Sequence, residues 1–305
     1  MPSLKWIRRS VLATLLAGCP APVAAGPDLT QQLDSLFREV PHATFEWTTA
    51  RDVSERAAMV VPVRLGGTGG LFQLDTGLDV TLLYGDIADD RGWEAYDGMY
   101  HVPSLEVGGM DLGPAWVRTC AETAKQDEII GSLGLDLLIG YLVLIDYPGR
   151  RLALLRPGEA PLWLWQRATW TPATLRDAKF FPYVILGGKG VDGLFFDTGS
   201  SAFDVIVDFD DWAELTGVAE PEAAPTQKMV NSWGKKVTAV GAPALGPMII
   251  GSARIASPQV FYLKEQPGLF RNWPFPAKGL LGNAPFWDRV VIMDLGIRPR
   301  FGILE

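Results

Sequence analysis

The feature that most constrains this chain is a pair of Asp-Thr-Gly tripeptides, each at the end of an apolar run. Asp75 follows Leu-Phe-Gln-Leu, and Asp197 follows Leu-Phe-Phe. A buried carboxylate is unfavourable unless a nearby group compensates for its lost hydration. Because two such aspartates occur in matched settings, we expect each carboxyl to be the partner of the other.

The sequence on both sides of the tripeptides also matches, which indicates an internal duplication. A Gly-Gly turn precedes each tripeptide, and a Gly-x-x-Gly segment follows each, at 131–134 and 279–282. The number of residues from that segment to a later Asp, Asp146 or Asp294, is the same in both halves. A tandem repeat of only two units favours a pseudo-two-fold dimer within one chain over a solenoid.

These motifs resemble the aspartic protease superfamily in its two-lobed, pepsin-like form. Residues 75–79 look most like the single-lobe, retropepsin-like type, whereas residues 197–201 are more similar to the pepsin type. The apolar-Gly segments at 129–131 and 280–282 match the strand that the family threads behind each catalytic loop. The resemblance covers roughly residues 58–305. It implies an all-β fold of two pseudo-two-fold related β-barrel lobes with a few short helices.

The resemblance implies that Asp75 and Asp197 are the catalytic residues of an aspartic endopeptidase. Two carboxyls about 3 Å apart share one proton, so one can take a proton from water while the other gives one. The threonines resemble residues whose hydroxyls bond across to the opposite loop, and the glycines permit a close turn. The residues expected to support the dyad are Thr76, Gly77, Thr198, Gly199 and Ser200.

One departure from the pepsin pattern distinguishes the two aspartates. Ser200 can donate a hydrogen bond to Asp197, whereas the corresponding first-half residue is Leu78. A hydrogen bond to a carboxylate favours its ionised form. We therefore expect Asp197 to hold the negative charge, Asp75 to hold the proton, and the pH optimum to be weakly acidic.

In the family a hairpin flap closes over the bound peptide, and the corresponding intervals here are identifiable. Asp-Gly between aromatic residues is a turn signal in the first half, and Asn-Ser-Trp-Gly occupies the matching interval of the second. The candidate flap residues are Tyr96, Gly98, Tyr100, Trp233 and Gly234. Ordinary core or surface aromatics are an equal alternative. An extended peptide is what such a groove would bind.

Few segments show helical periodicity. The pattern predicts helices over 29–40, 133–142 and 210–216, the last ended by Gly217. The alternating Leu and Trp residues within 157–172 instead predict a strand that packs at the lobe junction.

The N-terminal 25 residues have the basic and apolar regions of an export signal. Two cleavage readings remain open, a lipoprotein box that would make Cys19 the lipidated first residue, and ordinary cleavage after Ala25. We expect an exported protein, periplasmic or membrane-anchored, with secretion as the alternative.

The expected organisation of the chain is an export signal at 1–25, a spacer or helix at 26–57, an N-terminal catalytic lobe at 58–158 and a C-terminal catalytic lobe at 159–305.

The composition excludes several other functions. The chain has a net charge of −8, which disfavours nucleic acid and anionic membrane surfaces as partners. Only two cysteines and two histidines are present, and none has metal-ligand spacing, so no metal or cofactor is expected. We expect Cys120 to be a small buried apolar residue on a strand. We expect a monomer that acts on an extended peptide or protein.

Two other functions remain open on the same fold. One is a catalytically silent peptide-binding protein, and the other is a processing enzyme with a single protein substrate. Retention of both aspartates favours an active endopeptidase over the silent form.

Overall fold

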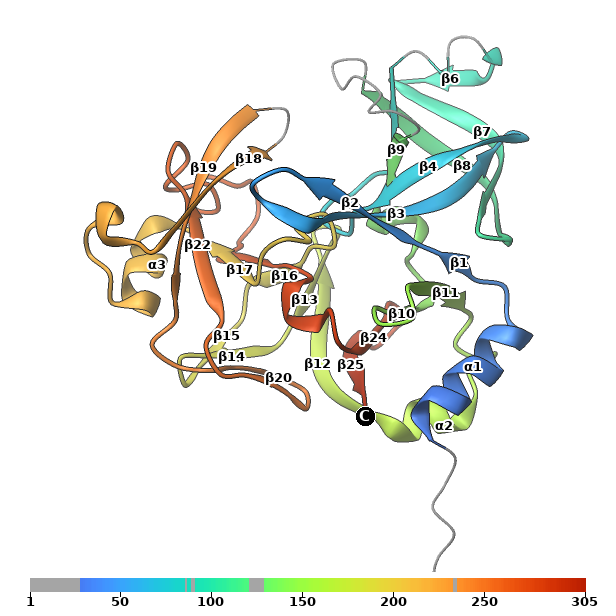
Figure 1. The fold of residues 1–305 in the computed structure, drawn as a ribbon. Coiled ribbons are helices and arrows are strands. Elements are labelled where there is room, and N and C mark those ends of the chain that lie inside the picture. The colour runs from blue at the N-terminus through green and yellow to red at the C-terminus, as the bar shows by residue number, and fades with distance from the viewer. Residues whose placement is uncertain (1–27, 86, 89–90, 121–128, 233–234) are drawn as a thin grey trace, which may run out of the picture.

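The described part of the chain folds mainly into β-strands that form several sheets, with three helices at their periphery and short 3₁₀ turns (Figure 1). The computed structural model describes residues 28–305 except 86, 89–90, 121–128 and 233–234. Within these residues, no helix has both the length and the apolar character needed to cross a bilayer. The predicted all-β class is confirmed at this level.

One sheet is built from residues of the first half and lies at the upper right of Figure 1. Its strand order is β2-β3-β4-β9-β5-β8-β7-β6, with β3 also paired to β7. Its strands are β2 (Glu46–Ala50), β3 (Ser54–Leu65), β4 (Thr68–Leu74), β5 (Leu82–Tyr84), β6 (Glu94–Tyr96), β7 (Met99–Val107), β8 (Met110–Cys120) and β9 (Ile129–Leu133).

Two further sheets come from the second half and lie to the left in Figure 1, with orders β16-β23-β17-β22-β19-β18 and β15-β14-β20-β21. The first contains β16 (Leu194–Phe196), β17 (Val205–Val207), β18 (Thr226–Ser232), β19 (Lys235–Pro243), β22 (Gln259–Leu263) and β23 (Gly279–Leu281). The second contains β14 (Val184–Leu186), β15 (Lys189–Val191), β20 (Met248–Ile250) and β21 (Ala253–Ile255).

The central pairing of the first half recurs in the second. Strand β4 runs parallel to β9, β9 antiparallel to β5, and β5 parallel to β8. In the same way β16 runs parallel to β23, β23 antiparallel to β17, and β17 parallel to β22. Strands β4 and β16 both end directly before an Asp-Thr-Gly tripeptide. The duplication seen in the sequence is therefore also a duplication of strand arrangement.

A shared sheet joins the two halves, with the order β1-β11-β10-β24-β25-β12-β13 (Figure 1, lower centre). Strands β10 and β24 pair along their full length and bring the halves together. Within each half a buried Asp at the end of one strand pairs with an Arg of the next, Asp146 with Arg151 and Asp294 with Arg300. The strands are β1 (Ala43–Thr44), β10 (Leu142–Asp146), β11 (Arg151–Leu155), β12 (Ala168–Arg176), β13 (Lys179–Pro182), β24 (Val290–Asp294) and β25 (Arg300–Leu304).

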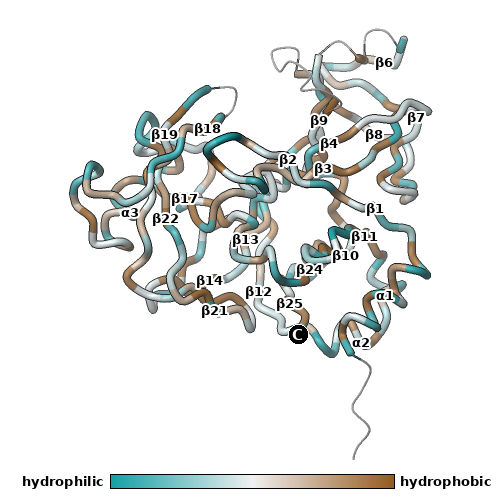
Figure 2. Tube along the Cα trace, viewed as in Figure 1, coloured by the Kyte–Doolittle hydropathy of each residue, from teal (hydrophilic) through white to brown (hydrophobic). Residues whose placement is uncertain are grey.

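Helices α1 (Leu29–Glu39) and α2 (Leu162–Arg167) pack against this shared sheet. Leu33, Leu36 and Phe37 of α1 form one apolar cluster with Leu144, Ile292 and other residues of β10, β11 and β24. Figure 2 shows both hydrophobic and hydrophilic positions along α1, as expected for a helix with one buried face. The predicted helix over 29–40 is confirmed. The segment expected to be a spacer or helix contains α1, β1 and β2, and β3 begins at Ser54, before residue 58.

Two other sequence expectations need correction. The segment 157–172 is not one strand, because Leu162–Arg167 forms α2 after Pro161, and β12 begins only at Ala168. Its tryptophans still pack at the junction of the halves, as expected. The helix expected over 133–142 is reduced to a 3₁₀ turn, Leu135–Leu137, because Leu142 already begins β10.

The helix predicted over 210–216 is present as α3 (Phe209–Thr216). It ends at Gly217, whose φ of 72° lies in the left-handed region that favours glycine. Two other 3₁₀ turns among the described residues are Pro221–Ala223 and Ala284–Phe286.

Replacing Phe37 with Ala should lower the free energy of unfolding by roughly 3–5 kcal/mol, the usual effect of truncating a buried aromatic residue. Phe37 is 3% exposed in the apolar cluster of the shared sheet, and the Arg151 guanidinium lies 4.2 Å from its ring centroid. Denaturant unfolding measures the change. The control is Leu162→Ala, at a side chain that is 69% exposed, which should change stability by less than about 0.5 kcal/mol. Equal effects of the two substitutions would mean that α1 does not stabilise the fold.

Candidate active site

The two aspartates predicted from the sequence lie together where the halves meet. Strand β4 ends at Leu74 and β16 ends at Phe196, so each delivers an Asp from a buried apolar strand. The two carboxyl groups are hydrogen-bonded to each other. A Cβ added to Gly77 would lie 2.5 Å from Asp197 Oδ1, and one added to Gly199 would lie 2.6 Å from Asp75 Cγ. Each glycine therefore leaves room for the carboxyl of the opposite loop.

Crossed threonine hydrogen bonds hold the two loops in register. The Thr76 hydroxyl donates to the Phe196 carbonyl (2.8 Å), and the Thr198 hydroxyl donates to the Leu74 carbonyl (2.9 Å). Each hydroxyl oxygen also accepts a hydrogen bond from the backbone N–H of the other threonine, at 2.9 and 3.1 Å. Both side chains are fully buried. The cross-loop contacts expected from the resemblance are present.

The two carboxyls have unequal local donors. In each loop a backbone N–H donates to the carboxylate two residues earlier, Gly77 to Asp75 (3.0 Å) and Gly199 to Asp197 (2.9 Å). The Ser200 hydroxyl adds a hydrogen bond to Asp197 Oδ2 at 2.8 Å. At the matching position of the first loop, Leu78 is buried and has no side-chain donor.

This inequality separates the two pKa values. Burial raises the pKa of Asp75 well above its ordinary value, and the charge of Asp197 and their mutual hydrogen bond raise it further. Burial also raises the pKa of Asp197, but hydrogen bonds from Ser200, Asp75 and Gly199 oppose that shift. The proton shared by the pair therefore resides mainly on Asp75, and Asp197 is the ionised partner.

Sequence reasoning missed a buried lysine beside this pair. Lys179 begins β13, is 5% exposed, and donates a hydrogen bond to the Ala178 carbonyl at 3.4 Å. Burial lowers its pKa, while the carboxylates of Asp79, Asp197 and Asp75 act in the opposite direction. The available sequence signal was a lysine directly before Phe-Phe-Pro, at the start of an apolar strand.

The candidate flap residues of the first half lie on a hairpin. Strands β6 and β7 are joined by Asp97 and Gly98, whose φ values of 50° and 73° fit the predicted two-residue turn. Tyr96 is 75% exposed and Tyr100 is partly buried. The corresponding hairpin of the second half is formed by β18 and β19. Trp233 and Gly234 lie outside the described residues, as do Cys19 and the predicted signal.

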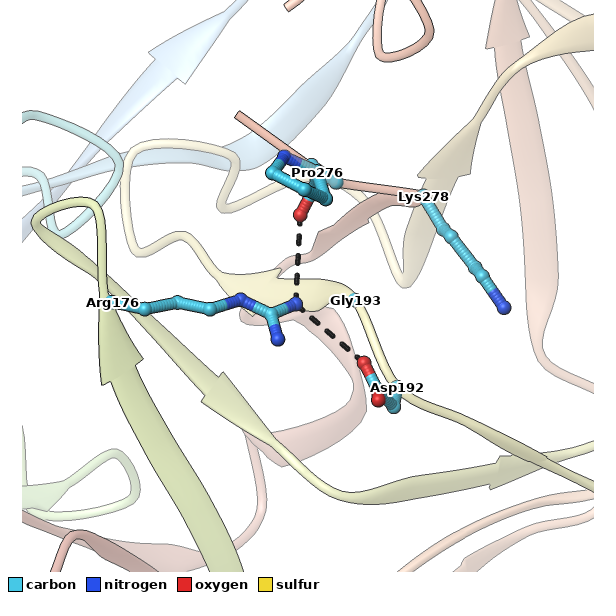
Figure 3. A pocket seen from close by; sticks show the side chains of 6 residues that line it. Arg176, Asp192, Gly193, Pro276 and Lys278 are labelled. Atoms are coloured by element: carbon cyan, nitrogen blue, oxygen red, sulfur yellow. Dashed lines mark hydrogen bonds and ion pairs between the residues drawn. The ribbon is translucent and has the colours of Figure 1, made fainter. Parts of the chain in front are cut away.

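Two pockets lie apart from the aspartate pair. A pocket of about 320 Å³ is lined by Arg176, Asp192, Gly193, Pro276, Ala277 and Lys278. Figure 3 shows the Arg176 guanidinium pointing toward the Pro276 carbonyl and the Asp192 carboxylate, with Lys278 directed away from it. A second pocket, of about 660 Å³, lies between α1, the turn after β10 and the C-terminal residues.

The described residues contain no cluster of His, Cys, Asp and Glu side chains able to hold a metal ion. Cys120 ends β8 and is only partly buried, which corrects the expectation of a buried side chain. Comparison with family models and with curated proteins returned no match for this chain. The chemical groups that the site offers are a carboxylic acid and the carboxylate to which it is hydrogen-bonded.

Replacing Asp75 with Asn should raise the free energy of unfolding at pH 7 and weaken its pH dependence. The folded-state pKa of Asp75 is raised above its ordinary value of 3.8. The folded protein therefore binds more protons than the unfolded chain between those two pKa values, so stability falls as pH rises through that window. Asn has no titrating proton and avoids this loss.

Urea unfolding of wild type and Asp75→Asn from pH 3 to pH 8 measures the difference. The free energy of unfolding of the variant should exceed that of wild type by an amount that grows as the pH rises above about 4. A gap that narrows or stays constant over this range would show that the carboxyl is not held protonated by the fold.

Proposed function

We propose that this protein is an aspartic endopeptidase of the two-lobed, pepsin-like type, with a retropepsin-like first lobe. The single observation that carries the proposal is the pair of aspartate carboxyls hydrogen-bonded to each other between two repeated strand arrangements. The matched order of β4, β9, β5, β8 and of β16, β23, β17, β22 supports the two-lobe assignment. The crossed threonine contacts support a loop pair that is rigid enough for catalysis.

The proposed chemistry needs only the two carboxyls and a water molecule. Asp197, as the carboxylate, takes a proton from the water that attacks the peptide carbonyl carbon. Asp75, as the acid, gives its proton to the carbonyl oxygen, and a tetrahedral diol results. When the diol collapses and its C–N bond breaks, Asp197 gives the proton that it took from water to the leaving amine. Asp75 takes a proton back from a diol hydroxyl, which restores the starting protonation of the pair. No covalent intermediate with the enzyme forms.

The proposed substrate is an extended peptide that lies across the aspartate pair. Backbone hydrogen bonds would hold such a peptide, and its side chains would alternate between the two sides of the groove. The β6–β7 hairpin, with Tyr96, Gly98 and Tyr100, is proposed to contact it from the first half. The β18–β19 hairpin, with Trp233 and Gly234, is proposed to do so from the second.

We also propose that the protein is exported and acts as a monomer on other chains. The basic and apolar regions of residues 1–25 support export, either anchored through a lipidated Cys19 or released after Ala25. Metal and nucleic acid have no part in the proposal.

Hydrolysis of a mixed peptide library from about pH 3 to pH 7 tests the endopeptidase. We expect cleavage that a statine-type inhibitor blocks, with a weakly acidic optimum because Asp75 lacks the extra donor that Asp197 has in Ser200. Asp75→Asn and Asp197→Asn should each reduce the rate by roughly 10²–10⁴-fold or more, since each removes one member of the acid–base pair.

The matched control is Asp210→Asn, at an exposed side chain paired with Arg271, and it should leave the rate unchanged. An optimum below about pH 3, between the coupled pKa values of pepsin, would contradict the proposed effect of Leu78. A rate within about tenfold of wild type in either dyad variant would contradict the mechanism. Inhibitor binding without hydrolysis would instead favour the silent peptide-binding protein.

A further inference from the structure

The peptide unit between Thr198 and Gly199 connects Asp197 to a hydrogen-bond network behind the loop. Its N–H belongs to Gly199 and donates to Asp197 Oδ1 at 2.9 Å. Its carbonyl belongs to Thr198 and accepts from Asn283 Nδ2 at 3.0 Å and from the Ser201 hydroxyl at 2.9 Å. The N–H and C=O of a trans peptide point in opposite directions within one plane. Fixing the carbonyl therefore also aims the N–H at the carboxylate.

Asn283 is the centre of this network. It is fully buried and comes directly after the Gly-x-x-Gly segment. Its Nδ2 also donates to the Ser201 hydroxyl oxygen at 2.9 Å. The Thr198 carbonyl can only accept, so it must face the amide nitrogen, which leaves Asn283 Oδ1 for the other side.

A tyrosine from the first half completes the network. The Tyr147 hydroxyl donates to Asn283 Oδ1 at 2.7 Å. Tyr147 follows β10 in the shared sheet, is 2% exposed, and stacks on Trp47 with ring centroids 6.2 Å apart. The amide of Asn283 is thus held from two sides, by a rigid aromatic residue of one half and by the catalytic loop of the other.

The first loop has no equivalent amide. Asp75 N–H donates to the Leu133 carbonyl and Asp197 N–H donates to the Leu281 carbonyl, so these two leucines are matching positions. Two residues later stand Leu135 and Asn283, respectively. Leu135 is fully buried and has no side-chain donor for the Thr76 carbonyl. Leu135 and Asn283 are thus a second difference between the two loops. Like Leu78 and Ser200, they place the extra side-chain donor in the loop of Asp197.

We propose that Asn283, held by Tyr147, is a positioning residue that orients the Thr198–Gly199 peptide and so makes Asp197 the ionised member of the pair. Hydrogen bonding to a peptide carbonyl also polarises its N–H and strengthens the bond that the N–H donates. The inference rests on the proposed function, and it adds residues that touch neither carboxyl.

The variants described below leave the residues of the other groups around the pair unsubstituted. These groups are Lys179 of β13 with Asp79 beside it, Tyr84 of β5, which faces Asp75, and the Ser200 hydroxyl. A changed titration of the pair in a variant of the network can therefore be assigned to the network.

The test uses three variants, Tyr147→Phe, Asn283→Leu and the double variant. Leucine has the same number of side-chain heavy atoms as asparagine, with the same branching. It is also the residue that the first loop has at the matching position, Leu135. The double variant removes both partners of the buried Tyr147–Asn283 bond, which leaves fewer unsatisfied groups than Asn283→Leu alone. The matched control is Tyr262→Phe, at a buried tyrosine that packs against Trp212 and Phe209.

Two readouts are measured, the ¹³C carboxyl NMR titration of the aspartate pair and the pH profiles of kcat and KM. In Asn283→Leu and the double variant, the lower apparent pKa of the pair should rise by about half a unit to one unit, as expected for one weakened bond to a charged group. The acid limb of the kcat/KM profile should move up by the same amount, with KM unchanged at the optimum. Tyr147→Phe should shift the lower apparent pKa and the acid limb in the same direction by a smaller amount. Tyr262→Phe should leave both quantities unchanged.

Each outcome decides a separate point. An unchanged pair titration in the double variant would overturn the role of Asn283, and an unchanged titration in Tyr147→Phe alone would remove Tyr147 from it. If Asn283→Leu does not fold, the other two variants carry the test. Absence of hydrolysis by the wild-type protein would count against the endopeptidase, whereas the NMR titration would still decide whether the network sets the ionised carboxyl.

Discussion

The arrangement of the two halves depends on placing two carboxyl groups in contact inside the protein. Neither would be stable there alone as a carboxylate, because burial removes its hydration. When the two carboxyl groups are in contact, they can share one proton. The N–H groups of Gly77 and Gly199 donate hydrogen bonds that stabilise the remaining negative charge. This solution requires the ends of β4 and β16 to meet, so the two halves must be held rigidly. The crossed threonine bonds and the pairing of β10 with β24 meet that requirement.

Rigidity at the carboxyls depends on structure at some distance from them. The shared sheet carries Tyr147 just after the β10 strand that pairs with β24, and the tyrosine hydroxyl reaches the Asn283 amide behind the second loop. The same sheet supports α1 and α2 through one apolar cluster. The packing at the junction and the electrostatics of the aspartate pair therefore both depend on the shared sheet.

Much of this could be predicted from local sequence. Asp97-Gly98 and the glycines at 66–67 identified their hairpins, because positive φ values are needed there. The two Asp-Thr-Gly tripeptides marked the carboxyl pair, because an Asp after a buried strand needs a partner. The error at 162–167 has a physical cause, since alternating Leu and Trp over so few residues fit a short helix as well as a strand. Lys179, Tyr147 and Asn283 were missed because their contacts are long-range and carry no local pattern.

A duplicated chain permits an asymmetry that a homodimer does not. In a dimer of identical loops, any donor placed behind one aspartate appears behind the other as well, and the two carboxyls remain equivalent. Here each half has its own residues, so Ser200 and Asn283 serve Asp197 while Leu78 and Leu135 occupy the matching places beside Asp75. In the proposed enzyme, acid and base would thereby be assigned before a substrate binds. The proposed enzyme would then not depend on the substrate to break the symmetry of its carboxyl pair.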